Sequence, residues 1–132
     1  MKNNINIAII GLGQIGIYLY NELKTKKNEI EKKTGKKIKI SAVSAKNKNK
    51  KRKFPFQKNI FFNKPLEIFK KKKIDILFEC IGLSDGISKK VVETALKRGI
   101  HVITPNKALI SKHGDSLARL AEQNNVNLEF EA

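Results

Sequence analysis

Three glycines close to the N-terminus have a spacing that could bind a phosphate group. Gly11, Gly13 and Gly16 form a G-x-G-x-x-G pattern between the apolar run of residues 5–10 and an amphipathic helical pattern. In such a turn the first glycine allows a sharp bend, the second lets the backbone approach a pyrophosphate, and the third lets the helix pack closely on the strand. The amides at the helix start would then face the phosphates. The predicted dinucleotide site includes Gly11, Gly13, Gln14, Ile15 and Gly16.

A second group suited to chemistry is Lys107, which stands directly after the segment "HVITPN". An ammonium group can stabilise negative charge that develops on an oxygen, or take part in a proton transfer. The alternative is a surface lysine at the start of a helix, although a cation is unfavourable at a helix N-terminus. The choice depends on the elements that place Lys107 relative to the glycines.

The hydrophobic pattern alternates between strand-like and helix-like segments. Strands are predicted over residues 5–10, 38–43, 74–81, 101–104 and 126–130, and a short apolar patch covers residues 60–62. Helices are predicted from residue 14 to a stop at Gly35, around residues 66–69, and over residues 88–98 and 115–123. Apolar strands that alternate with helices predict a doubly wound, parallel α/β sheet of the Rossmann type.

The carboxyl ends of parallel strands lie at one edge of the sheet, where open α/β sheets bind their ligands. The glycine turn follows the first predicted strand, Ile81 and Gly82 end the strand that begins at residue 74, and Lys107 follows the strand of residues 101–104. These residues should therefore share one edge. We assign Ile81 and Gly82 to the cofactor site and expect Lys107 beside cofactor and substrate.

Length and composition indicate one cytoplasmic domain. The 132 residues fit a single domain, and a hydrophobic content of 40% is enough for a core. No apolar run approaches the roughly 18 residues of a membrane span, and the first residues lack a signal-peptide cleavage pattern. The single cysteine, Cys80, suits a reducing cytosol, and its apolar neighbours indicate a core residue rather than a nucleophile. No cysteine or histidine pair has zinc-ligand spacing.

The formal net charge of +16 would attract polyanions. However, the sequence contains no helix-turn-helix signature, zinc finger or RNA-recognition aromatic pair. Lysine, asparagine and isoleucine are all abundant, which indicates a general drift in composition. We therefore expect no specific nucleic-acid partner and no membrane partner.

The segment after the second predicted strand bears on the choice of dinucleotide. An NAD-binding chain usually has an acid there that accepts from the ribose 2′-hydroxyl. Here no acidic residue occurs between Glu31 and Glu67, and Lys46 begins the basic run "KNKNKKRK". A 2′-phosphate would meet cations, so we predict that NADP(H) is favoured over NAD(H). Most of the run is expected to be solvated, with Lys46 or a lysine shortly after it touching the cofactor.

Four segments, in order, resemble the N-terminal half of homoserine dehydrogenase: "GLGQIG", "ILFECIG", "HVITPNKALISKHG" and "LEFEA". The resemblance covers essentially the whole chain and implies an NAD(P)-binding domain of an oxidoreductase that interconverts aspartate 4-semialdehyde and homoserine, in threonine and methionine biosynthesis. Two positions depart from the family. Pro105 replaces a more usual alanine and should stiffen its turn, and Leu83 replaces a second glycine and could reshape the loop beside the nicotinamide.

The resemblance also implies roles for individual residues. The family lysine that matches Lys107 lies between cofactor and substrate, so Lys107 is the expected catalytic residue. The family residue that matches Glu131 helps to hold a structural sodium ion through its backbone carbonyl. His113 matches a family "HG" pair and is expected to begin a helix or to pack, rather than to act as an acid or base. The residues expected on the nicotinamide side are Thr104, Pro105 and Asn106.

In this family a second domain supplies substrate-binding acids, another catalytic lysine and most of a homodimer interface. We expect residues 1–132 to be the dinucleotide-binding domain alone, because Ala132 falls where the crossing to the second domain would begin. We therefore expect no activity without that domain. Two other interpretations stay open: a stand-alone nucleotide-binding or regulatory module, and part of a related aspartate-type dehydrogenase.

Overall fold

The computed structural model describes residues 3–45 and 59–130. The strands are β1 (Asn4–Ile10), β2 (Lys37–Ser44), β3 (Phe61–Phe62), β4 (Ile76–Glu79), β5 (His101–Thr104) and β6 (Leu128–Phe130). The helices are α1 (Gln14–Thr25), α2 (Lys27–Thr34), α3 (Ile68–Lys71), α4 (Ile87–Lys97) and α5 (Lys107–Gln123), and a 3₁₀ turn, η1, covers Pro65–Glu67.

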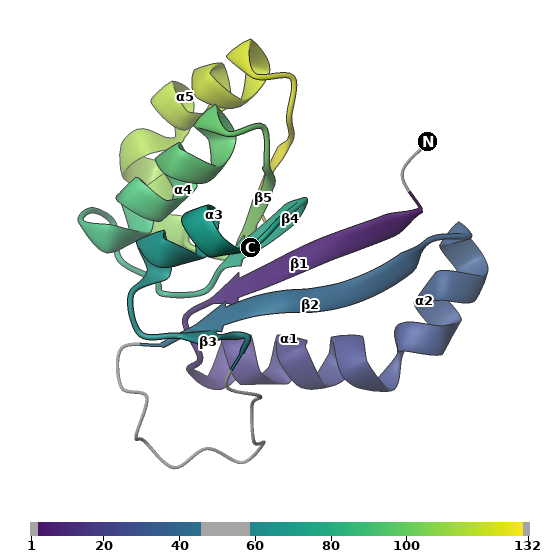
Figure 1. Cartoon of the computed structure of the whole chain (residues 1–132). Coiled ribbons are helices and arrows are strands. Elements are labelled where there is room, and N and C mark those ends of the chain that lie inside the picture. The colour runs from purple at the N-terminus through teal and green to yellow at the C-terminus, as the bar shows by residue number, and fades with distance from the viewer. Residues whose placement is uncertain (1–2, 46–58, 131–132) are drawn as a thin grey trace.

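The strands form one parallel sheet in the order β3-β2-β1-β4-β5-β6 (Figure 1). Strand order reverses between β1 and β4, because β2 and β3 lie on one side of β1 while β4, β5 and β6 lie on the other. The prediction of a doubly wound α/β domain is confirmed. The carboxyl ends of β1 and β4 are neighbours at this reversal point, which is where such sheets bind ligands.

Helices cover both faces of the sheet, with α1 and α2 on one face and α3, α4 and α5 on the other (Figure 1). Alternating side chains of β1 point to these two faces. Ile7 and Ile9 belong to the core beside α1, whereas Ala8 and Ile10 belong to the core beside α4 and α5. A strand buried on both faces needs a continuous apolar run, which is why residues 5–10 could be recognised from the sequence.

The predicted helix from residue 14 to Gly35 is two helices. Lys26 separates α1 from α2 with φ −100° and ψ 10°. The bend brings Glu31 to the start of β2, where its carboxylate accepts a hydrogen bond from the Ile38 N–H at 2.8 Å. Gly35 ends α2 with φ 72°, as predicted for a left-handed helix stop.

The predicted helix of residues 115–123 is too short, because α5 begins at Lys107. Its cap is Asn106, whose side-chain Oδ1 accepts a hydrogen bond from the Leu109 N–H at 3.0 Å. Gly114 lies inside α5. β4 is conversely shorter than predicted, since the chain leaves the sheet at Glu79.

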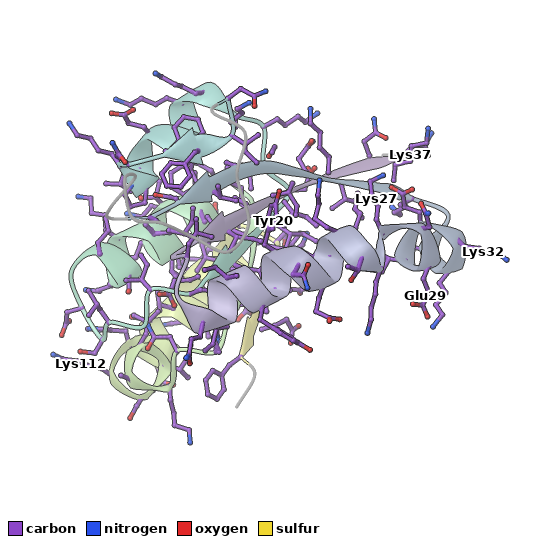
Figure 2. The ribbon with its side chains drawn as sticks, turned by 90° about the horizontal axis from the view of Figure 1, so that it is seen from below. Tyr20, Lys27, Glu29, Lys32, Lys37 and Lys112 are labelled. Carbon is purple, nitrogen blue, oxygen red and sulfur yellow. The ribbon has the colours of Figure 1, made fainter. Side chains whose placement is uncertain are left out.

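Lysine side chains project from several elements rather than from one stripe. Figure 2 labels Lys27 and Lys32 on α2, Lys37 on β2, and Lys112 on α5 at the opposite side of the view. Among the described residues, no helix is long and apolar enough to cross a membrane. The same residues contain no cluster of three or more His, Cys, Asp or Glu side chains that could hold a metal ion.

Candidate functional site

Gly11 holds the turn after β1 against two other strands. Its N–H donates to the Ser44 carbonyl oxygen at 2.8 Å, and its φ of +100° is a conformation that favours glycine. A Cβ atom at this position would lie 2.6 Å from the Cys80 carbonyl carbon and 2.8 Å from the Ile81 nitrogen. The bend is therefore packed between the ends of β2 and β4, and the protein itself requires glycine here.

Gly16 and Gly13 differ in what surrounds them. A Cβ atom at Gly16 would lie 1.9 Å from the Gly11 carbonyl oxygen, so the close approach of helix and turn requires glycine. A Cβ atom at Gly13 would meet no atom within 4 Å, and its φ of −81° suits any residue. Neither packing nor backbone conformation explains glycine at position 13. An open backbone is, however, what a pyrophosphate needs in order to approach, so this turn fits a dinucleotide.

The N-terminus of α1 adds hydrogen-bond donors beside Gly13. The first helical hydrogen bond runs from the Ile17 N–H to the Gly13 carbonyl oxygen at 3.0 Å, so the amides of residues 14–16 precede it. The first turn of α1 contains no acid, and Gln14 and Ile15 are exposed. Free amides and the positive end of the helix dipole together favour an anion here.

Glu79 is a buried carboxylate at the carboxyl end of β4, and the sequence reasoning did not single it out. Its exposed fraction is 0%. One oxygen, Oε2, accepts from the Ile81 N–H at 2.9 Å and from the Gly82 N–H at 3.0 Å. The other, Oε1, accepts from the Thr104 hydroxyl at 2.6 Å. The sequence could have indicated Glu79, because it contains an acid inside the apolar segment "ILFECIG" and strands buried on both faces seldom carry an acid.

The turn after β5 is tied to the loop after β4 by Asn106. Its backbone N–H donates to the Thr104 Oγ1 at 3.0 Å, and its side-chain Nδ2 donates to the Leu83 carbonyl oxygen at 2.7 Å. Thr104 and Asn106 are 0% and 5% exposed, while Pro105 between them is partly exposed. The polar side chains of this turn are thus engaged within the protein.

Lys107 is the first residue of α5, and its side chain is exposed. It makes no ion pair with any residue that the structure describes. It follows the end of β5, on the same edge of the sheet as the glycine turn and Gly82. The edge predicted from the sequence therefore brings the glycines, Gly82 and Lys107 to one side of the sheet.

Asp85 anchors the loop after β4 to α5. Its carboxylate pairs with the Lys112 ammonium, and its Oδ1 lies 2.7 Å from the His113 Nε2. The hydrogen bonds from Lys112 and then from His113 lower the pKa of Asp85 to about 2. Of the two structural roles expected for His113, beginning a helix is not the one found, because His113 lies inside α5. With a side chain only 18% exposed, His113 packs against this loop.

Cys80 behaves as a core residue. It is partly buried against the core beside α1, and burial raises the pKa of its thiol to about 12. A thiol of that pKa is protonated at neutral pH, whereas nucleophilic cysteines act as thiolates.

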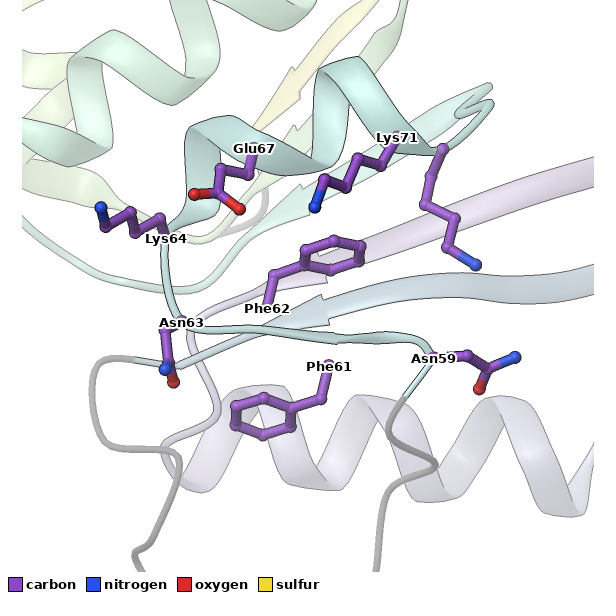
Figure 3. A pocket seen from close by; sticks show the side chains of 8 residues that line it. Asn59, Phe61, Phe62, Asn63, Lys64, Glu67 and Lys71 are labelled. Atoms are coloured by element: carbon purple, nitrogen blue, oxygen red, sulfur yellow. The ribbon is translucent and has the colours of Figure 1, made fainter.

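Two predicted contact residues, Lys46 and Glu131, lie outside the described residues. A cation that the sequence reasoning missed lies close to the described end of β2. Lys64 follows the short strand β3, and β3 ends beside β2, since the Ala45 N–H donates to the Phe62 carbonyl oxygen at 3.3 Å. Lys64 and Phe62 are among the residues that line a hollow of about 490 Å³. In Figure 3 the Phe62 ring points into this hollow, and Lys64 lies at one end of it with its ammonium directed away from that ring. A strand of two residues is too short to recognise from its hydrophobic pattern. The sequence therefore did not indicate that Lys64 follows the end of a strand.

Comparison with known proteins points to one family. The family described as "Homoserine dehydrogenase, NAD binding domain" matches residues 11–131. Homoserine dehydrogenase of Neisseria gonorrhoeae is 34% identical over 128 residues, which cover 97% of this chain and 29% of the relative. The enzyme of Pseudomonas aeruginosa is 30% identical over 131 residues, again covering 97% of this chain and 29% of the relative. The chain thus spans about 29% of the length of these curated relatives.

Solved structures agree with the sequence relatives. Homoserine dehydrogenase of Staphylococcus aureus at pH 7.0 superimposes with a TM-score of 0.89 and 33% identity, over 98% of this chain and 33% of that chain. The enzyme of Thiobacillus denitrificans gives a TM-score of 0.84 and 25% identity, over 97% of this chain and 29% of that chain. The resemblance inferred from the four sequence segments is confirmed. The chain belongs to the family of homoserine dehydrogenase NAD-binding domains.

Proposed function

We propose that residues 1–132 form the dinucleotide-binding domain of a homoserine dehydrogenase and bind NADP(H) in preference to NAD(H). The observation that carries the proposal is the open position at Gly13, next to the amides of residues 14–16, which precede the first hydrogen bond of α1. Gly11 and Gly16 are explained by contacts within the protein, whereas Gly13 is explained by a ligand that approaches its backbone.

The two halves of the sheet suggest where each half of the cofactor lies. In a doubly wound sheet the pyrophosphate sits on the first helix, and the two nucleotides spread to either side of the reversal point. The adenosine half then lies beyond β2 and β3, where Lys46 and Lys64 would meet a 2′-phosphate. The nicotinamide half lies beyond β4 and β5. Since Thr104 and Asn106 use their side chains internally, contacts there would come from Ile81, Gly82, Pro105 and backbone atoms.

The proposed reaction is the interconversion of aspartate 4-semialdehyde and homoserine, a step in threonine and methionine biosynthesis. The bound nicotinamide would supply or accept the hydride. Lys107 is suited to stabilise negative charge on the substrate oxygen, because its ammonium is exposed at the ligand-binding edge and has no ion-pair partner among the described residues. Substrate-binding acids would come from a second domain, within a cytoplasmic homodimer. A sodium site at the Glu131 carbonyl stays a prediction.

Calorimetric titration of this chain with NADPH and NADH tests the cofactor proposal. NADPH should bind more tightly, and the difference should shrink as salt rises, because part of it is electrostatic. Gly13→Val should weaken both cofactors by at least about tenfold, since its side chain would occupy the space of the phosphates. Gly13→Ala should give a smaller loss, and neither change should lower the melting temperature much. Unchanged binding in Gly13→Val would place the phosphate site elsewhere.

A further inference from the structure

The carboxylate of Glu79 closes a ring of hydrogen bonds at the nicotinamide end of the proposed site. From Glu79 the ring passes through the Thr104 hydroxyl to the Asn106 N–H. The Asn106 side chain continues to the Leu83 carbonyl oxygen, and the loop returns to Glu79 through the Gly82 and Ile81 amides. The loop after β4 and the turn after β5 are thus held in one mutual arrangement.

The ring carries an energetic cost that an apolar residue would avoid. Glu79 is fully buried and makes no ion pair within the described part of the chain. Burying a carboxylate costs several kcal/mol by order of magnitude unless hydrogen bonds compensate, and an apolar side chain would fill the same space without that cost. Leu77, two residues earlier on β4, is such a side chain. What the carboxylate adds is a fixed position for the two segments that it joins.

Those two segments are the ones that flank the nicotinamide half of the proposed cofactor site. One contains Ile81 and Gly82, and the other leads directly into Lys107 through the Asn106 cap. The phosphate-binding turn, by contrast, is built from Gly11 and Gly16 and contributes no atom to the ring. The turn packs against the Ile81 nitrogen, but no hydrogen bond of the ring runs through it. A change in the ring should therefore act mainly on the nicotinamide half of the cofactor.

We propose that Glu79 is a positioning residue for the nicotinamide, acting through the Thr104 hydroxyl and the backbone of residues 81–82. The inference rests on the proposed function. It assigns to Glu79 no contact with cofactor or substrate. Its effect is to hold the loop after β4 and the turn before Lys107 at the separation that a nicotinamide ring requires.

Glu79→Gln is the sharpest variant, because only one of its two polar atoms can accept. The amide oxygen can still accept from the Ile81 and Gly82 amides, but the amide nitrogen then faces Thr104 Oγ1 and can only donate to it. The Thr104 hydroxyl hydrogen therefore loses its charged acceptor, and any hydrogen bond that remains runs in the opposite direction. Thr104→Val cuts the same link from the other side, and Thr104→Ser keeps the hydroxyl. Glu122→Gln is the matched control, since Glu122 is exposed on α5.

Each variant is titrated with NADPH and with 2′-phospho-ADP-ribose, which lacks only the nicotinamide, and its melting temperature is recorded. Glu79→Gln and Thr104→Val should weaken NADPH by at least about tenfold and change binding of the truncated nucleotide less than about twofold. The double variant should be no worse than Thr104→Val alone, because both changes act on the same link. Thr104→Ser and Glu122→Gln should bind both nucleotides as the unaltered chain does.

The outcomes separate this inference from the proposed function. If the unaltered chain binds neither nucleotide, the proposed function fails. If it binds both and Glu79→Gln and Thr104→Val weaken both equally, or weaken neither, the positioning role of Glu79 is wrong while the cofactor site stands. Should Glu79→Gln fail to fold, Thr104→Val and Thr104→Ser decide the question alone.

Discussion

The two halves of the sheet present the ligand-binding edge in different ways. On the β1–β3 side, the turn after β1 is shaped by missing side chains, since Gly11 and Gly16 allow close contacts and Gly13 leaves an open space. On the β4–β6 side, the loops are shaped by side chains that bind one another, with Glu79, Thr104 and Asn106 at the centre. The turn on the first side leaves its backbone accessible because it is made of glycines. The loops on the second side are held in place by hydrogen bonds between their own residues.

This difference suits the two parts of a dinucleotide. A pyrophosphate needs close approach to backbone amides, which glycine provides. A reacting ring needs to be oriented to within a fraction of an ångström, which requires loops whose positions are fixed. The comparison predicts that substitutions on the β1–β3 side act on affinity or on folding. Those on the β4–β6 side should act on the nicotinamide half of the cofactor, through its binding and orientation, and on turnover.

The largest effect is expected on the β4–β6 side, at Lys107. In an enzyme that carries this domain, Lys107→Ala should lower kcat by about 10²–10⁴-fold, because one charge-stabilising or proton-transferring group is lost. NADPH affinity should change little. Lys107→Arg should not restore full turnover, since a planar guanidinium differs in shape from an ammonium. Lys97→Ala, exposed on α4, serves as control. Near-normal turnover in Lys107→Ala would make this lysine a surface residue.

Gly16 and Gly13 should separate folding from binding on the β1–β3 side. Gly16→Ala places a Cβ atom 1.9 Å from the Gly11 carbonyl oxygen, so the helix must shift. We expect a loss of about 1–3 kcal/mol in the free energy of unfolding, as for other overpacked sites. Gly13→Ala should change it by less than about 0.5 kcal/mol. Urea unfolding measures both, and equal losses would contradict the distinction drawn between these two glycines.

Lys64 provides a finer test of the adenosine half. Lys64→Ala should weaken NADPH by about two- to tenfold and leave NADH unchanged, because only NADPH carries the 2′-phosphate. Lys71→Ala is the control, since Lys71 lines the same hollow from α3 (Figure 3). Equal losses for both cofactors, or for both variants, would leave 2′-phosphate recognition to other residues.

The smallest effect is expected at Asp85, on the opposite half. Its pKa of about 2 in the folded chain lies below the ordinary value for aspartate of roughly 3.9. Its contribution to stability is therefore present above about pH 4 and is lost as the pH falls towards 2. Since the carboxylate is 48% exposed, Asp85→Asn should lower the melting temperature only slightly at pH 7. The difference between the two chains should vanish near pH 2, and a constant difference would contradict the assignment.

Most of the fold could be predicted because strands buried on both faces leave continuous apolar runs. Residues 101–104 match β5, and residues 5–10 fall within β1. The start of α5 could not be predicted, because it depends on the cap at Asn106, whose side chain also reaches the distant Leu83 carbonyl oxygen. The local hydrophobic pattern does not contain information on an interaction between residues that meet only in the folded chain.

The candidate site divides in a similar way. The glycine turn and Lys107 could be proposed from the sequence because each stands in a short, contiguous pattern. The ring around Glu79 could not, since it joins residues from β4, β5 and the start of α5 that are distant in sequence. Thr104 and Asn106 were predicted as nicotinamide contacts. Their hydrogen bonds within the protein join the turn after β5 to the loop after β4, a role that the spacing of residues in the sequence did not reveal.

The strand order also bears on how the chain reaches its native state. Every neighbouring strand pair except β1 and β4 joins strands that follow each other in the chain. Pairing β1 with β4 requires closure of a long loop that contains α1, α2, β2 and β3, and such distant pairings are slow to form. The contact between Gly11 and Cys80 lies in that pairing. A nascent chain therefore lacks the phosphate cradle until its two halves dock, so cofactor capture is confined to molecules that have completed folding.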